Sequence, residues 1–274
     1  MEIIELDVWS KFGCFTKPFS NSGGMLTYFI PPKTSIIGMI GAILGYKFDD
    51  YVTNDEGTNT YCIEKLNDIK VSIQPLFPLK TKRVTFNQVS NKGISNIRQD
   101  VLINPYYKLF IVFPNSLESE KNIFLERIKS QKSVFNLYMG KNEFMLNYKL
   151  INVYKYKTFK LDNSNKNDFF SSRNVIYGSL NRKDIKDATL KSDKINTKKV
   201  LFSGGNSKKL ESFYEYFIHD YPIKRENFVE FEFSPISFYS INKDEKCYFS
   251  DIELKDNCFL ELCNIGDKKW ISLI

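Results

Sequence analysis

Basic side chains are concentrated between residues 78 and 108 of this 274-residue chain. Six basic residues and one acidic residue lie there, so the local net charge is six minus one, or +5. They are Lys80, Lys82, Arg83, Lys92, Arg98 and Lys108, with Asp100 as the acid. Cations gathered in this way bind nucleic-acid phosphates, and Val84 or Phe86 could wedge between bases. An ordinary solvated hairpin has the same composition, although long insertions in compact domains are usually functional.

A second polar cluster follows the first apolar segment of the chain. It offers an ammonium, two hydroxyls and an amide, on Lys17, Ser20, Ser22 and Asn21. Such groups donate hydrogen bonds to phosphates or to a ribose 2′-hydroxyl. A plain turn has the same composition, so the sequence leaves both interpretations open.

Residues suited to catalysis are scarce. His219 is the only histidine, whereas metal-free cleavage of RNA ordinarily requires a general base and a general acid near the 2′-hydroxyl. Cys247, Cys258 and Cys263 lack the C-x-x-C spacing of a zinc site. The chain contains neither a G-x-x-x-x-G-K-[ST] phosphate loop nor a G-x-G-x-x-G dinucleotide motif. We therefore expect no enzymatic activity, no metal and no cofactor.

The overall composition favours a polyanionic partner in a reducing compartment. Lys and Arg number 39 against 32 Asp and Glu, a formal net charge of +7, which alone favours nucleic acid only weakly. The five cysteines are an odd number in a chain too long to need disulfides, and no signal peptide precedes the first strand-like segment. We therefore expect a cytoplasmic protein. The longest apolar run, Ile36 to Leu44, is too short to span a membrane.

Periodic patterns predict the elements that position these residues. Apolar side chains alternate with Glu5 and Asp7 over residues 2–9, as in a half-buried strand. Further strands are predicted at Ile69–Phe77, Tyr106–Phe113 and Tyr148–Phe159, and helices at residues 34–45 and 117–130. The order over residues 2–160 is β-α-β-β-α-β, which is that of a ferredoxin-like, RRM-type fold.

Three glycines interrupt the first predicted helix, which Thr34 or Ser35 would cap. Gly38, Gly41 and Gly45 each cost about 1 kcal/mol relative to alanine in a helix. We expect them to let the helix approach a neighbouring sheet closely, which is a structural role and not a contact with a ligand.

The predicted organisation is one α+β domain followed by a smaller β region. Residues 1–160 form the ferredoxin-like domain, with a protruding β-hairpin inserted at about 78–108. Residues 161–199 are rich in Asn, Lys, Asp and Ser and are predicted to be a polar connector. Residues 200–274 are predicted to form a small antiparallel β region, with a helix at Lys209–His219.

Several segments are similar to the signature of one protein family. They are Lys17-Pro18-Phe19, Leu26-Thr27-Tyr28, Pro31-Pro32-Lys33-Thr34, the glycine-rich Ile37–Gly45, Arg98–Pro105 and Leu137–Phe144. On these segments, the chain closely resembles the CRISPR-associated Cas-five family over residues 1–160.

This resemblance implies a fold of the RAMP superfamily with the basic hairpin as its thumb. It implies a non-catalytic subunit of a type I CRISPR surveillance complex (Cascade), of type I-B. Such a subunit binds and caps the 5′ handle of the guide RNA (crRNA), beside the repeated backbone subunit and the large subunit that inspects target DNA. The residues that the resemblance implies in RNA binding are Lys17, Ser20, Asn21, Lys80, Lys82, Arg83, Arg98 and Gln99.

Two other functions stay open at this level. A related branch of the family, type I-C, cleaves precursor crRNA with Tyr, Lys and His side chains. Here no histidine precedes His219, although a variant built on Tyr28 and Lys33 would allow a metal-independent endoribonuclease. The chain could also be mainly a protein-interaction scaffold, because its aromatic C-terminal part is weakly charged.

Overall fold

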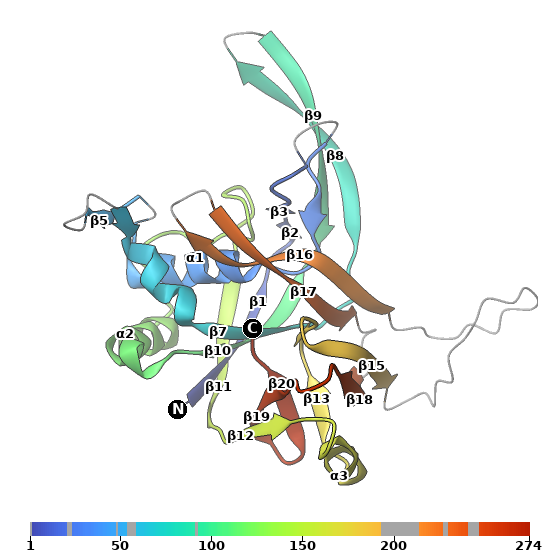
Figure 1. Ribbon diagram of the computed structural model, residues 1–274. Coiled ribbons are helices and arrows are strands. Elements are labelled where there is room, and N and C mark those ends of the chain that lie inside the picture. Colours follow the sequence, from blue (N-terminus) through green and yellow to red (C-terminus); the bar gives the residue numbers. More distant parts are fainter. Residues whose placement is uncertain are drawn as a thin grey trace, which may run out of the picture.

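The computed structural model describes residues 2–20, 24–47, 49–53, 59–90, 93–192, 214–226, 230–240 and 247–274. Within them the chain is a mixed α/β protein in which strands predominate and three α-helices occur (Figure 1). No helix in these ranges is long and apolar enough to cross a membrane, and no three side chains of the metal-binding types gather there.

A four-stranded antiparallel sheet lies at the centre of the molecule (Figure 1). Its order is β11-β1-β10-β7, with the bounds β1 Glu2–Trp9, β7 Lys70–Pro75, β10 Tyr106–Val112 and β11 Asn147–Lys155. In β1, Ile4, Leu6 and Val8 enter the main core, as their alternation predicts. The strand predicted at Tyr148–Phe159 is in fact two strands, because β12 (Thr158–Leu161) joins another sheet.

Two helices cover one face of the central sheet. The helix α1 (Lys33–Leu44) contributes Ile36 and Ile40 to the core, and α2 (Glu118–Lys129) contributes Phe124 and Ile128. Neither Thr34 nor Ser35 caps α1, since Pro32 occupies the N-cap position without a side-chain hydrogen bond. Proline has no backbone N–H, so it removes one of the unpaired donors at the start of the helix.

A six-stranded sheet from the second half of the chain covers one end of the opposite face (Figure 1). Its order is β12-β19-β20-β13-β18-β15, with the further bounds β13 Val175–Tyr177, β15 Ile185–Ser192, β18 Cys247–Leu254, β19 Leu260–Gly266 and β20 Lys269–Ser272. Cys263 and Ile271 share an apolar cluster with Ile3 and Phe110 of the central sheet. Glu5, which the alternation places on the solvent side, is therefore buried. This sheet is not wholly antiparallel, because β13 and β20 pair in parallel.

Within the described residues, strands and a short helix replace parts of the predicted polar connector and of the predicted C-terminal helix. Between residues 161 and 192 the chain forms α3 (Lys166–Ser171), β13, β14 (Leu180–Asn181) and β15. Residues 193–199 lie outside the described ranges. Where a helix is predicted at Lys209–His219, the structure has strand β16 (Tyr214–Glu226), because this segment pairs with β17 (Glu230–Ser240) along its length.

The strands β14, β17 and β16 form a three-stranded sheet that completes the main core. Its apolar contributions are Ile218, Tyr221, Ile236 and Phe238. The Tyr28 hydroxyl donates to the carbonyl of Asp220 (2.7 Å), and the Tyr221 hydroxyl donates to the carbonyl of Pro31 (2.9 Å). The two halves of the chain therefore share one core.

The insertion between β7 and β10 is a hairpin that projects from the body of the protein (Figure 1). It consists of β8 (Thr81–Ser90) and β9 (Gly93–Ile103). The remaining short elements are β2 Phe12–Gly13, β3 Phe15–Thr16, β4 Thr27–Tyr28, β5 Tyr51–Thr53, β6 Asn59–Tyr61, and the 3-10 helices η1 Cys62–Asp68 and η2 Asn115–Leu117. Since β2 pairs with the base of β9, the hairpin is anchored to the loop that follows β1.

Candidate nucleic-acid interface

The register of the β8–β9 hairpin divides the predicted RNA-binding residues between its two faces. Side chains alternate along a strand, and residues paired across two strands share a face. The register places Arg83 and Arg98 on one face. Lys82 and Gln99 lie on the other face, and Lys80 is exposed just before the hairpin. The structure therefore does not gather the predicted cations in one patch.

The face with Arg83 and Arg98 forms one wall of a small concavity of about 320 Å³, the hairpin-base pocket. Its lining residues are Phe19, Ser20, Gly24, Met25, Leu26, Arg83 and Arg98. The loop after β3 forms the other wall, because Met25 joins the edge of β9. The Met25 N–H donates to the carbonyl of Arg98 (2.8 Å), and its carbonyl accepts from the N–H of Asp100 (2.9 Å). Of the predicted residues, Arg83 and Arg98 of the hairpin and Ser20 of the loop thus meet at this pocket.

The two arginines of the hairpin-base pocket differ in charge compensation. Asp100 accepts hydrogen bonds from Nε (2.8 Å) and Nη2 (3.3 Å) of Arg83, and this pairing raises the pKa of Arg83. Arg98 is exposed and meets no carboxylate within the described part of the chain. A phosphate entering the pocket would find Arg98 uncompensated and Arg83 held in a fixed orientation by its partner.

The loop residues have unequal roles. The Ser20 hydroxyl is buried, donates to the carbonyl of Lys17 (2.8 Å) and accepts from the N–H of Leu26 (3.1 Å), so it closes the loop. The Lys17 ammonium lies 5.1 Å from the ring centre of Tyr28 and 5.9 Å from that of Phe19. Asn21 lies outside the described residues. Of this predicted cluster, Lys17 is the described residue with a charge to offer.

Gln99 is buried and binds Lys141, a residue that was not among those predicted to bind RNA. Its side-chain oxygen accepts a hydrogen bond from Nζ of Lys141 (2.6 Å), which also lies 3.5 Å from the sulfur of Met25. Among the described residues, no carboxylate pairs with Lys141. The signal that could have identified it is the segment Leu137–Phe144, where a tyrosine, a glycine and a lysine follow one another closely.

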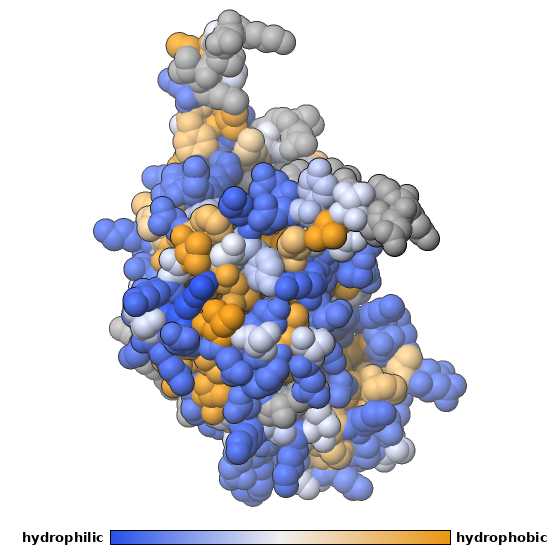
Figure 2. All heavy atoms as spheres, turned by 90° about the vertical axis from the view of Figure 1, so that its left-hand side faces the viewer, coloured by the Kyte–Doolittle hydropathy of each residue, from blue (hydrophilic) through white to orange (hydrophobic). Residues whose placement is uncertain are grey.

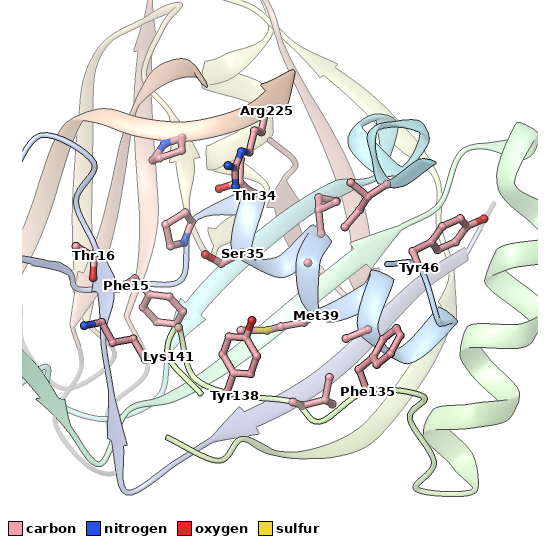
Figure 3. A pocket seen from close by; sticks show the side chains of 18 of the residues that line it. Phe15, Thr16, Thr34, Ser35, Met39, Tyr46, Phe135, Tyr138, Lys141 and Arg225 are labelled. Carbon is pink, nitrogen blue, oxygen red and sulfur yellow. The ribbon is translucent and has the colours of Figure 1, made fainter. Parts of the chain in front are cut away.

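A larger concavity, the α1 groove, runs beside α1 and has a volume of about 670 Å³ (Figure 3). One face of α1 lines it, together with parts of the β3–β4 region, η1, the segment 135–141 and the end of the β16–β17 hairpin. The lining residues of α1 are Thr34, Ser35, Ile37, Gly38, Met39 and Ala42. Its aromatic and cationic side chains include Phe15, Tyr28, Tyr46, Phe135, Tyr138, Phe231, Lys47, Lys141 and Arg225. Apolar side chains are exposed among hydrophilic ones on the side of the molecule where α1, α2 and β5 lie (Figure 2).

The concavities share a border. Lys141 lines the α1 groove and lies 3.5 Å from the sulfur of Met25, which lines the hairpin-base pocket. Lys17 lies between Tyr28, which lines the groove, and Phe19, which lines the pocket. Lys17 and Lys141 therefore lie where the two concavities adjoin.

Comparison with known proteins identifies the family of the chain. The family model described as CRISPR-associated protein (Cas_Cas5) matches residues 3–166. The chain belongs to this family. No curated protein matches it.

Solved structures similar to this Cas_Cas5 family member have little sequence identity with it. A CRISPR protein from Archaeoglobus fulgidus has 10% identity and a TM-score of 0.47, over 100% of this chain and 98% of that one. A chain of a CRISPR RNA-guided surveillance complex has 8% identity and a TM-score of 0.45, over 92% and 91% of the two chains. A Cas protein has 12% identity and a TM-score of 0.42, over 90% and 95%.

In this Cas_Cas5 family member, a tight loop presents Tyr138 and Lys141 to the α1 groove. The loop is closed by hydrogen bonds from the N–H of Met139 to the carbonyl of Phe144 (2.7 Å) and from that of Leu146 to the carbonyl of Leu137 (3.0 Å). The Cys14 N–H in turn donates to the carbonyl of Met139 (3.0 Å), which ties the loop to the segment between β2 and β3. The position of both side chains is therefore fixed by backbone contacts.

The residues considered for cleavage do not meet in the α1 groove of this Cas_Cas5 protein. Tyr28 lines the groove, but its hydroxyl is bonded to the Asp220 carbonyl and burial raises its pKa, so it is a poor base. Lys33 is buried at the start of α1 and is not among the lining residues. His219 is exposed on β16, where its ring packs on Phe217 (4.4 Å between ring centres).

The buried Lys33 ammonium has an effect on stability that can be measured. Desolvation lowers the pKa of Lys33 to about 8, although the charge of Asp68 partly opposes this. Below pH 8 the folded state therefore buries a charged ammonium at a cost. Between pH 8 and the usual lysine pKa of 10.5, the folded state has released this proton while the unfolded chain still binds it, so stability rises with pH.

The Lys33→Met variant is accordingly expected to be more stable than the wild type by about 2 kcal/mol at pH 7. The difference should shrink towards pH 10, because the wild type then loses the buried charge. Urea unfolding at both pH values measures it, with Lys191→Met on an exposed side chain as the control. An unchanged difference between pH 7 and pH 10 would contradict the assignment.

Proposed function

We propose that this Cas_Cas5 family member is a subunit of a type I CRISPR surveillance complex, of type I-B, that binds and caps the 5′ handle of the crRNA. The observation that carries the proposal is the hairpin-base pocket, where the exposed Arg98 of β9 meets no carboxylate among the residues that the structure describes. Salt-dependent contacts between such cations and phosphates dominate the affinity of proteins for RNA.

The fold supports this function. Along the chain, β1, α1, β7, β10, α2 and β11 follow one another in the order of a ferredoxin-like domain of RAMP type, with β8 and β9 as its thumb. Lys17 and Lys141 extend the cationic surface from the thumb towards the α1 groove. The bound RNA would follow this path, with its backbone on the cations and its bases towards the exposed rings.

We propose that this subunit does not cleave RNA. Its single histidine is exposed on β16, away from the residues that line either concavity. Tyr28 and Lys33, the remaining candidates for acid and base, do not both line the α1 groove. Incubating the purified protein with repeat RNA in a chelator tests this part of the proposal. Uncut RNA is the expected result, and discrete metal-independent cleavage would overturn it.

The proposed partners are those of such a complex. They are the repeated backbone subunit, the large subunit and, through the complex, target DNA, in the cytoplasm. Membership of the Cas_Cas5 family supports these assignments.

Charge reversal at the hairpin base tests RNA binding. The Arg98→Glu variant is expected to bind repeat-derived handle RNA about tenfold more weakly at 0.15 M salt, with a smaller dependence of affinity on salt. The matched control is Lys191→Glu, an equal change of charge on the exposed strand β15 of the six-stranded sheet. Fluorescence anisotropy across a salt series measures both affinities for the handle. Equal affinities for the two variants would contradict the proposal.

A further inference from the structure

Among the described residues, no neighbour of Gly38 requires glycine at this position. Gly38 lies inside α1, where glycine is among the poorest helix formers. A Cβ built on it meets no atom of the described residues within 4 Å, apart from its own stretch of helix. The prediction that the helix glycines allow close approach to a sheet is therefore wrong for Gly38, and the neighbours of Gly41 and Gly45 lie in η1 and in a loop and not in a sheet.

The other two helix glycines do have local reasons. A Cβ at Gly41 would lie 2.9 Å from Cδ1 of Ile63 in η1. Gly45 ends the helix with φ of 84°, the left-handed conformation that favours glycine. Gly38 instead lines the α1 groove, so its missing side chain leaves the helix backbone open to whatever occupies the groove.

The groove around Gly38 has walls suited to a flat ring. Tyr138 and Phe135 lie on one side of it, with 45% and 39% of their surfaces exposed, and Met39 of α1 lies beside them (Figure 3). Exposed aromatic rings stack on nucleobases of any sequence. A glycine in a helix permits a ring to lie directly against the backbone, which a side chain would prevent.

Charge on the groove margin favours a nucleotide over an apolar peptide. Lys141 stands at one end without a carboxylate partner among the described residues, and the Lys17 ammonium lies over the ring of Tyr28, which lines the groove. At another part of the margin, the Arg225 guanidinium lies 5.1 Å from the ring centre of Phe231. Three cations (Lys47, Lys141 and Arg225) and two acids (Asp49 and Glu64) line the groove. The Lys141 end, with apolar side chains beside it, matches a base with its phosphate.

We propose that the α1 groove seats one unstacked nucleobase of the bound RNA, which lies against the α1 backbone at Gly38 and contacts the ring of Tyr138. This inference rests on the proposed RNA-binding function and adds a second subsite to it. The RNA backbone passes from the hairpin-base pocket over Lys17 and Lys141, and one base turns into the groove. The ligand class of this subsite is a single-stranded nucleotide.

A double-mutant cycle between protein variants and RNAs that lack one base tests whether the α1 groove binds a nucleobase. Handle RNAs that each lack one base are bound to the wild type and to Gly38→Leu, whose side chain fills the groove. At one position of the handle, removal of the base is expected to lower the affinity of the wild type about tenfold. Gly38→Leu should bind the intact handle about tenfold more weakly and lose nothing further at that position. Gly38→Ala should fall between them.

The Tyr138 ring provides an independent arm. Tyr138→Ala is expected to weaken binding of the intact handle. Tyr138→Phe keeps the ring, so its affinity for the handle should lie within about twofold of that of the wild type. Thermal unfolding checks the fold of each variant, and Gly38→Ala should melt no lower than the wild type, because alanine is the better helix former.

The outcomes separate this inference from the proposed function. If Arg98→Glu weakens RNA binding while the effects of base removal and of Gly38→Leu on affinity are additive or absent, the α1 groove does not bind a base, and the handle-binding function stands. If Gly38→Leu leaves RNA binding intact but prevents another subunit from joining the complex, the groove holds a protein and again does not bind a base. If Arg98→Glu also has no effect, the proposed function itself fails.

Discussion

Gly140→Ala is expected to lower the free energy of unfolding by at least about 3 kcal/mol. Gly140 has φ of 86°, a conformation that costs any residue with a Cβ. The added Cβ would also lie 2.6 Å from the carbonyl carbon of Cys14 and 2.9 Å from Cδ1 of Phe15. Neither contact can be relieved without separating the loop from β3. Urea unfolding followed by circular dichroism measures the loss.

Gly93→Ala is the matched control. Gly93 also has a positive φ, 113°, but a Cβ there meets no atom of the described residues within 4 Å. Comparing the two variants therefore isolates the steric clash from the backbone strain. Because the displaced loop carries Tyr138 and Lys141, Gly140→Ala should also weaken handle RNA binding, whereas similar stability for both variants would refute the packing described for this loop.

Lys108→Met is expected to lower the free energy of unfolding by about 3 to 5 kcal/mol, because it leaves two carboxylates inside the protein without their counter-ion. Lys108 bonds the buried Glu5 and lies 3.1 Å from Asp7, and Tyr154 donates to Glu5 as well. Burial opposes the charge on Lys108, but the hydrogen bond and charge of Glu5, together with Asp7, raise its pKa above the usual range. The methionine would leave the Glu5 carboxylate without its counter-ion.

The control for this change is Lys70→Met. Lys70 pairs with Glu261 at 3.4 Å, but about half of each side chain is exposed (53% and 45%), so less than about 1 kcal/mol is expected. Adding Glu5→Gln to Lys108→Met should restore part of the stability, because the buried carboxylate is then neutral. No recovery in the double variant would point to packing and not to charge.

The sequence was sufficient for elements whose own pattern determines them. The strands β1 and β10 and the helix α2 have clear periodicities, and each lies close to its predicted position. The strands β15 and β16 were missed because pairing partners decide them. Local sequence contains no information about a partner that is folded against it, so an aromatic segment such as Tyr214–Glu226 is readily predicted as a helix.

The candidate site shows the same division. Residue types alone indicated a cationic hairpin, and the structure has a hairpin there. Which cations share a face depends on register, since a shift of one residue would exchange Arg83 with Lys82. Lys141 could not be joined to Gln99 by pattern, because 42 residues separate them in the chain. The open position of Gly38 likewise depends on the arrangement of η1 and the segment 135–141 around α1.

The core shared by the two halves of the chain has a consequence for synthesis in the cell. Apolar residues from Ile4 to Leu146 are covered in part by Ile218, Tyr221, Ile236 and Phe238. At translation rates of roughly 5 to 20 residues per second, the ribosome needs on the order of 4 to 14 seconds to travel from Leu146 to Ile218. During that interval the nascent chain exposes an incomplete apolar surface, so we expect the growing polypeptide to be a client of ribosome-associated chaperones.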